Sequence, residues 1–302
     1  MLPAFPTPLV RIANLFPDRR VYAKCEFPVP SGSFKIRGAK HLLDHLSREL
    51  GPRELVVPSM GNTALAAALG AKLYGFRMIG VVPTTITRAK DEKLQALGVE
   101  LVKVEGGGSD LLRHATELAR KRGAYFVHPH LDPLWTDGYQ SIVTEILAAL
   151  PECRTLIFPV GGGGLLMGLT ARLQSQPATL RLVGVEAYNA PKYAHFTHVR
   201  SKTIADGLVL ETPHPEVQER IAAMGVTVEM VRDEAIRAAV AALFRMQGLL
   251  VEPSSAVPVA WVQARVAELQ EPICVVLTGE NIAREDFYRL IETVELPGSD
   301  AD

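Results

Sequence analysis

Short apolar runs alternate along the chain with segments in which apolar residues recur every three or four positions. Buried β-strands are predicted at RVYAKCEF, ELVVPS, MIGVVP, VELVKVE, AYFVHPH, TLIFPV, RLVGVEA and PICVVLTG. Helical periodicity lies between them, as in residues 36–50 and residues 62–74. Residues 188–225 have the weakest pattern, are rich in Pro and His, and are expected to form loops with short helices.

Strands that are apolar throughout and separated by helices are typical of parallel sheets that helices cover on both faces. We therefore predict an α/β protein with mostly parallel sheets. The chain has 302 residues, of which 48% are hydrophobic, so it is long enough for two domains with packed cores.

The charge balance and the cysteines indicate which partners and which cellular compartment to expect. A formal net charge of −1 offers no attraction to nucleic acid or to an anionic membrane, and no apolar run approaches the length of a membrane span. Cys25, Cys153 and Cys274 are far apart and form no CxxC pair, which is typical of buried thiols in a reducing compartment. We therefore expect a cytoplasmic protein that binds neither nucleic acid nor membranes.

Two glycine runs each follow a predicted strand and precede a predicted helix. In TLIFPVGGGGLLMGL, residues 161–164 can present successive backbone amides at a helix start, where a phosphate is favoured. The spacing is neither the dinucleotide GxGxxG nor a P-loop. We interpret this run as a site for a single phosphate, with a flexible structural turn as the alternative. Residues 106–108 precede Ser109 and Asp110, which are predicted helix caps, so that run is interpreted as structural.

Three further turns carry polar side chains. In SGSFKIRG, Lys35 follows Phe34 at an expected helix start, either as a solvated lysine or as an amine held out of water to react with a carbonyl. Asn62 and Thr63 open a helix whose amides could receive a carboxylate, or Asn62 merely caps that helix. Thr278 ends a strand, where its hydroxyl could donate to an aromatic nitrogen or cap the turn. Such strand ends gather on one edge of a parallel sheet, where α/β proteins bind ligands.

Six motifs occur in an order that resembles a known family. They are SGSFKIRGA, PSMGNTA, PVGGGGL, TIADGL, VEPSSA and VVLTGEN. Together they resemble the pyridoxal-phosphate enzymes of the tryptophan-synthase-β fold type, and within it the serine/threonine dehydratase and serine racemase group. The resemblance extends over residues 7–281. It implies fold type II, with two three-layer α/β domains: a large domain of residues 1–53 and 132–302, a small domain of residues 54–131, and the cofactor in the cleft.

The resemblance also implies roles for individual residues. Lys35 would form a Schiff base with pyridoxal 5'-phosphate and, once released, would take the Cα proton of the substrate. Phe34 would pack beside the cofactor ring, Asn62 would bond its phenolic oxygen, and Thr278 would meet the pyridine nitrogen. The residues implied for the cofactor phosphate are Gly161, Gly162, Gly163, Gly164 and Leu165. Those implied for the substrate are Ser59, Met60, Gly61, Asn62 and Thr63.

Three positions depart from the pattern of the group. Met60 stands where racemases of the group carry a serine, and since a thioether cannot carry a proton we expect weak racemisation and dominant elimination. Glu186 and Ala190 match a stretch that binds a divalent cation in relatives, but Lys192 stands at the position of an aspartate ligand. We expect its ammonium to replace the cation and to pair with Glu186 or nearby carbonyls, and we expect no metal site. Glu280 replaces a glycine common in the group and puts a carboxylate close to Thr278, where it is either solvated or alters the electronics of the cofactor.

On this resemblance we expect a lyase that deaminates L-threonine, L-serine or both, yielding a 2-oxo acid and ammonia. One alternative is a β-replacement enzyme similar to cysteine synthase or threonine synthase. Another is a non-catalytic protein that binds a phosphate ligand on the same fold, although binding alone needs no reactive amine at Lys35. Members of the group are commonly dimers, so a homodimer is expected.

Overall fold

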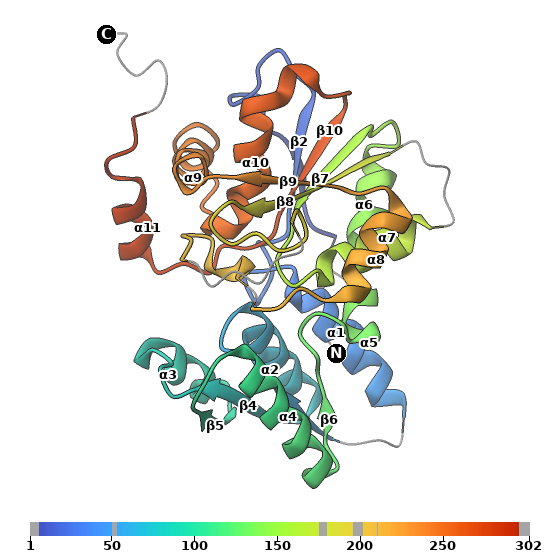
Figure 1. Cartoon of the computed structure of the whole chain (residues 1–302), viewed down its shortest axis with the longest axis vertical. Helices are drawn as coiled ribbons and strands as arrows, with labels where there is room; N and C mark the ends of the chain where they lie inside the picture. Colours follow the sequence, from blue (N-terminus) through green and yellow to red (C-terminus); the bar gives the residue numbers. More distant parts are fainter. Residues whose placement is uncertain (1–5, 50–52, 175–179, 196–201, 210, 296–302) are drawn as a thin grey trace. The chain divides into compact units, whose positions relative to one another are not determined.

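The computed structural model describes residues 6–49, 53–174, 180–195, 202–209 and 211–295 (Figure 1). Two compact units contain them. The first consists chiefly of Val29–Ser141 and Gly163–Ala171, and the second of Thr7–Pro28, Ile142–Gly162 and the chain from Arg172. Each unit has its own sheet, and the α/β class with mostly parallel strands is confirmed. The domain limits implied by the resemblance stay a prediction.

The first unit is built on a parallel sheet with the strand order β5-β4-β3-β6. Its strands are β3 (Glu54–Val57), β4 (Arg77–Pro83), β5 (Glu100–Val104) and β6 (Tyr125–Phe126). Its helices are α1 (Lys35–Arg48), α2 (Asn62–Tyr74), α3 (Arg88–Ala96), α4 (Gly108–Arg122), α5 (Pro133–Thr136) and the 3-10 turn η1 (Asp137–Tyr139), and most of α7 (Gly164–Leu173) belongs to it.

Helices cover the strands of this sheet, and most residues of the two central strands β3 and β4 are buried as a result. Helix α2 packs against β3 and β4, α3 packs against β5, and α4 packs against all four strands. Val56 and Val81 share a buried cluster with Ala115 and Ala119 of α4. Helix α1 packs against α2.

The second unit has the strand order β1-β2-β10-β7-β8-β9, in which only the β1–β2 pair is antiparallel among the described strands. Its strands are β1 (Leu9–Arg11), β2 (Val21–Cys25), β7 (Thr155–Pro159), β8 (Arg181–Ala187), β9 (Thr227–Val231) and β10 (Ile273–Leu277). Its helices and 3-10 turns are α6 (Gln140–Ala149), η2 (Asp206–Leu208), α8 (Pro215–Met224), α9 (Asp233–Gln247), α10 (Pro253–Arg265), η3 (Val266–Glu268) and α11 (Arg284–Ile291).

The core of the second unit lies between its sheet and the helices near the end of the chain. Val275 and Val183 of the sheet share one buried cluster with Val240 of α9 and Trp261 of α10. In Figure 1, α9 and α10 lie on one side of this sheet and α6 on the other. Among the described helices, none combines the length and the apolar character that crossing a membrane requires.

The structure contains elements that the hydrophobic pattern does not predict. Strands β1 and β9 are at the two edges of their sheet and are largely half-exposed, so they lack a continuous apolar run. Residues 226–265 carry no assignment from the pattern and form β9, α9 and α10. The expectation of short helices within residues 188–225 is confirmed by η2 and by the ten-residue helix α8. The helix predicted at residues 36–50 is α1, and Leu50 lies outside the described residues.

Candidate active site

Lys35 is the first residue of α1, and its amine lies against aromatic rings. The Nζ atom is 4.9 Å from the centroid of the Phe34 ring and 5.7 Å from the centroid of the Tyr139 ring. These two rings are themselves 4.7 Å apart, and both are buried. Lys35 is half-buried, so it is not a fully solvated surface lysine, and its reaction with a carbonyl stays a prediction. The two rings therefore shield one side of the amine.

Tyr139 was not predicted, and close packing holds its ring beside Lys35. A methyl group added at Gly38 would lie 2.7 Å from Nε1 of Trp135, and one added at Gly138 would lie 2.4 Å from the carbonyl oxygen of Arg37. The indole of Trp135 donates a hydrogen bond to the Tyr139 hydroxyl. Burial raises the pKa of Tyr139 well above its ordinary value, so the ring carries a neutral phenol.

The turn of residues 59–63 joins the carboxyl end of β3 to the start of α2. Gly61 is the N-cap of the helix and Asn62 its first residue, so the interpretation of Asn62 as the cap is wrong. The Ser59 hydroxyl accepts a hydrogen bond from the Gly61 amide at 3.3 Å. Thr63 is buried, whereas Met60 is 37% exposed. No acidic residue lies in the first turn of α2, so its amides offer positive partial charge to a carboxylate.

Residues 161–164, called here the glycine turn, join the carboxyl end of β7 to the start of α7. A methyl group at Gly161 would lie 3.0 Å from Cα of Leu208, and one at Gly164 would lie 3.1 Å from the carbonyl oxygen of His130. Gly163 has a φ of +89°, in the region that favours glycine. The first turn of α7 holds no acidic residue, so the amides at its start suit an anion.

Thr278 lies at the same sheet edge as the start of the glycine turn. Strands β10 and β7 are parallel neighbours with Val275 opposite Ile157, and Thr278 and Gly161 follow their ends. The Thr278 side chain is buried. The structure thus brings Thr278 and Gly161 together within the second unit, as expected for the carboxyl ends of parallel strands.

Two serines at the start of α10 hold loops of this edge, and sequence reasoning missed their role. Ser255 Oγ accepts from the Gly279 amide at 3.3 Å, directly after Thr278. Ser254 Oγ accepts a hydrogen bond from the Gly207 amide at 3.1 Å. The backbone of Gly207 and Leu208 packs against Gly161, so Ser254 holds the segment that borders the glycine turn. The motifs TIADGL and VEPSSA contained the signal, because small polar residues after a proline at a helix start often bond a neighbouring backbone.

Glu280 follows this strand end and is half-buried. Partial burial raises the pKa of its carboxyl group. Whether this carboxyl group is solvated or alters the electronics of the cofactor stays a prediction.

Residues 106–108, called here the capped turn, differ from the glycine turn although they join β5 to α4 in the same way. Gly107 is the N-cap, and the Asp110 carboxylate accepts from the Gly107 amide at 3.2 Å. The prediction of Ser109 as a cap is therefore wrong, while Asp110 caps the helix from its third position. This agrees with the structural interpretation of the run.

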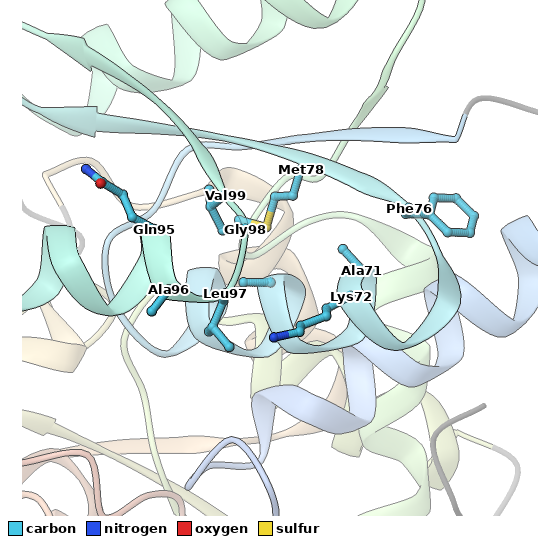
Figure 2. Close-up of a pocket in the computed structure, with 10 residues that line it drawn as sticks. Ala71, Lys72, Phe76, Met78, Gln95, Ala96, Leu97, Gly98 and Val99 are labelled. Carbon is cyan, nitrogen blue, oxygen red and sulfur yellow. The ribbon is translucent and has the colours of Figure 1, made fainter.

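A pocket elsewhere in the first unit contains none of the residues predicted for the site. Figure 2 shows the residues that line it, which come from α2, from Phe76 just before β4, from β4 and from residues 95–99. They are Ala68, Ala71, Lys72, Phe76, Met78, Gln95, Ala96, Leu97, Gly98 and Val99. Its lining is mostly apolar and offers no cluster of groups suited to catalysis.

The predicted residues fall into two sets, each described within its own unit. Phe34, Lys35, residues 59–63 and residues 163–165 belong to the first unit, and Gly161, Gly162 and Thr278 belong to the second. Their chemistry fits pyridoxal phosphate: a primary amine beside aromatic rings for the aldehyde, a turn tightly packed at Gly161 and Gly164 for the phosphate, and a buried hydroxyl for the ring nitrogen.

Comparison with known proteins gives the family. Residues 1–279 match the family described as pyridoxal-phosphate dependent enzyme. The chain is 32% identical over 281 residues to the L-threonine ammonia-lyase of Geobacter sulfurreducens. The alignment covers 90% of this chain and 70% of that protein. For the L-threonine ammonia-lyase of Thermotoga maritima the identity is 31% over 278 residues, with 90% and 69% covered. The processed form of threonine deaminase isoform 2 from Solanum lycopersicum superposes with a TM-score of 0.86 and 27% identity, covering 96% of this chain and 83% of that one.

The family match contains the first five motifs and reaches residue 279 within the sixth, VVLTGEN, in agreement with the resemblance seen in the sequence. Since the family match covers far more than half of the chain, the protein belongs to the pyridoxal-phosphate dependent enzymes, and pyridoxal phosphate is its cofactor.

Proposed function

We propose that the protein is an ammonia-lyase that deaminates L-threonine, L-serine or both by β-elimination. The observation that carries the proposal is the amine of Lys35, which lies against the Phe34 and Tyr139 rings at the start of α1. The relatives named L-threonine ammonia-lyase support the choice of substrate. In the net reaction, the Cα proton and the β-hydroxyl group leave as water, and a second water molecule then releases ammonia and leaves a 2-oxo acid.

Lys35 is the residue that we propose for attachment of the cofactor and for transfer of the Cα proton. When bound, pyridoxal phosphate withdraws electrons from the bonds to the substrate Cα and so acidifies its proton. A free amine at Lys35 takes that proton and holds it as an ammonium. The buried rings of Phe34 and Tyr139 limit the approach of water to one side of the amine.

The glycine turn and Leu165 would hold the cofactor phosphate through backbone amides at the start of α7. Thr278 would donate its hydroxyl to the pyridine nitrogen. A neutral hydroxyl cannot keep that nitrogen protonated as a carboxylate would. The site therefore favours departure of a β-substituent over a long-lived carbanion, which supports elimination as the main reaction.

Residues 59–63 would bind the substrate carboxylate at the start of α2, whose first turn holds no acidic residue. The Asn62 side chain would donate to the phenolic oxygen of the cofactor. Met60 carries no exchangeable proton on its thioether, so it cannot protonate Cα. We therefore propose that racemisation is weak in this protein.

Borohydride reduction of the holoenzyme, followed by peptide mapping, tests the attachment site. The expected result is a single modified lysine at position 35. Lys35→Ala is expected to lower the rate of 2-oxo acid formation from L-threonine and L-serine by about 10³ or more. Lys40→Ala is the matched control on the same helix, because Lys40 is engaged with Asp44 at 2.6 Å and should leave that rate nearly unchanged.

A modified lysine at another position would contradict the proposal. So would a purified protein that forms no 2-oxo acid from either amino acid but joins sulfide to O-acetylserine, which is the reaction of a β-replacement enzyme.

We further propose that the protein is a homodimer and that it is located in the cytoplasm. Cys25, Cys153 and Cys274 are free and buried, which supports a reducing compartment. The homodimer rests on the resemblance alone, and light scattering of the purified protein measures it; a monomeric mass would contradict it.

A further inference from the structure

A fully buried carboxylate organises the loop that follows β8. Glu186 accepts hydrogen bonds from the backbone amides of Lys192 and Tyr193, each at 3.0 Å, and from the amide of Ala194 at 3.2 Å. The Glu186 side chain has no exposed surface. A buried charge is costly unless hydrogen bonds and a counter-charge compensate it, so this loop needs a cation nearby.

Lys192 supplies that cation from within the loop. Its side chain is 1% exposed, and its ammonium donates to the carbonyl oxygen of Ala190, as predicted. Burial lowers the pKa of Lys192, while the charge of Glu186 acts in the opposite direction. A carboxylate together with a backbone carbonyl is the oxygen set that binds hard cations, and here the ammonium binds the carbonyl while the carboxylate binds backbone amides of the same loop.

The same loop contacts the glycine turn through Tyr193. The Tyr193 hydroxyl donates to the carbonyl oxygen of Gly162 at 3.4 Å and accepts from the amide of His214 at 3.2 Å. Burial raises the pKa of Tyr193 to about 12, so the side chain is a neutral phenol that both donates and accepts. Glu186, Lys192, Tyr193 and Gly162 all belong to the second unit.

We propose that Lys192 is a built-in cation that positions the glycine turn: with Glu186 it shapes the loop from which Tyr193 holds Gly162. Lys192 and Tyr193 are positioning residues that set the affinity for the cofactor phosphate, and the wild-type protein needs no added metal for this. The inference rests on the proposed function of the glycine turn in phosphate binding. Glu186 thereby affects the cofactor without touching it.

Paired titrations of apoprotein with pyridoxal phosphate and with pyridoxal test the inference. Pyridoxal has the same aldehyde but no phosphate, so only an effect on the glycine turn changes the ratio of the two dissociation constants. Tyr193→Phe removes one oxygen and should weaken pyridoxal phosphate binding about fivefold, as expected for one hydrogen bond. Lys192→Met keeps an unbranched side chain that is one atom shorter, removes the charge, and should weaken pyridoxal phosphate binding about tenfold or more. In both variants the constant for pyridoxal should change by less than about twofold.

Lys24→Met is the matched control. Lys24 is likewise 1% exposed, and it binds Glu145 at 2.5 Å and the carbonyl of Thr7 at 2.6 Å. Its loss should lower the melting temperature and leave the ratio of the two constants unchanged. In Lys192→Ala, added K⁺ or Mg²⁺ should restore part of the lost affinity, because the oxygen set remains.

Unchanged ratios in Tyr193→Phe and Lys192→Met would overturn the inference, as would a strong rise in the melting temperature of wild-type protein on adding Mg²⁺ or Ca²⁺. If the wild-type apoprotein forms no adduct with pyridoxal phosphate at Lys35, that result contradicts the proposed function. It does not bear on the role of Lys192 and Tyr193 in positioning the glycine turn.

Discussion

The glycine turn and the capped turn occupy the same kind of place in the chain, after a parallel strand and before a helix, but only one of them supplies its own anion. In the capped turn the Asp110 carboxylate accepts from the Gly107 amide and pairs with Arg113 at 3.2 Å. The helix start is therefore already satisfied by a residue three positions into the helix. A phosphate there would meet a negative charge.

The glycine turn has no such residue, because apolar Leu165 and Leu166 occupy the first positions after Gly164. Its backbone is instead packed closely against Leu208 and His130. Two glycine runs of similar composition thus differ in what satisfies the helix amides. The comparison teaches that the residues after a glycine run, more than the run itself, distinguish an anion site from a structural turn.

Placing a carboxylate at the first residue of the helix after each turn should give the largest difference in cofactor affinity. Gly164→Asp puts a carboxylate at the first residue of α7, where it would repel the cofactor phosphate at short range. Pyridoxal phosphate affinity should fall about 100-fold or more, which corresponds to roughly 3 kcal/mol and is within the range for two close charges near a protein surface. Gly108→Asp makes the same change at the first residue of α4, and affinity should stay within about twofold.

Equilibrium titration of both apoproteins measures this pair of variants. Equal affinities in Gly164→Asp and Gly108→Asp would contradict the assignment of the phosphate to the glycine turn.

Adding one methyl group to the glycine turn should weaken cofactor binding, whereas adding one to the capped turn should lower the stability of the fold. In Gly161→Ala the methyl group would lie 3.0 Å from Cα of Leu208, so the turn must shift by a few tenths of an ångström. We expect about tenfold weaker pyridoxal phosphate binding. In Gly106→Ala the methyl group would lie 2.1 Å from the Asp110 carboxylate, at a φ of +115°. We expect a loss of about 1–3 kcal/mol in the free energy of unfolding, with unchanged binding.

Denaturant unfolding of the apoproteins, combined with the same titration, checks this second pair. The comparison breaks down if Gly106→Ala loses cofactor affinity while Gly161→Ala retains it.

The smallest expected effect concerns the anion within the capped turn. The hydrogen bond from Arg113, aided by the Gly107 amide, holds the pKa of Asp110 below its ordinary value of 3.8. A carboxyl group with a lowered pKa stabilises the fold above its unfolded-state pKa, and this stabilisation is lost as pH falls through the folded-state pKa. Asp110→Asn should therefore lower the melting temperature near neutral pH, and the difference from wild type should shrink in acid.

A series of melting curves from neutral to acidic pH measures the difference between wild type and Asp110→Asn. A difference that stays constant down to the lowest pH would mean that the charge of Asp110 does not contribute to capping.

Local features of the sequence determined much of the fold. The apolar runs and helical periods predicted the strands and helices whose pattern is continuous, such as β7 and α2, because side-chain periodicity directly reflects which faces are covered. The ordered motifs were sufficient to indicate the family and to single out Lys35, the glycine turn and Thr278. Strands β1 and β9 escaped prediction because LVR is very short and TVEMV has a glutamate at its centre, so neither contains a long apolar run.

Only the tertiary structure decided which distant residues support the candidate site. Tyr139 lies beside Lys35 although 104 positions separate them, Ser255 holds Gly279, and Tyr193 reaches Gly162. Periodicity and turn preferences are local properties of the backbone, whereas these contacts depend on how helices and loops pack after the chain has closed on itself. The chain by itself therefore specifies the reactive groups, and packing specifies what surrounds and positions them.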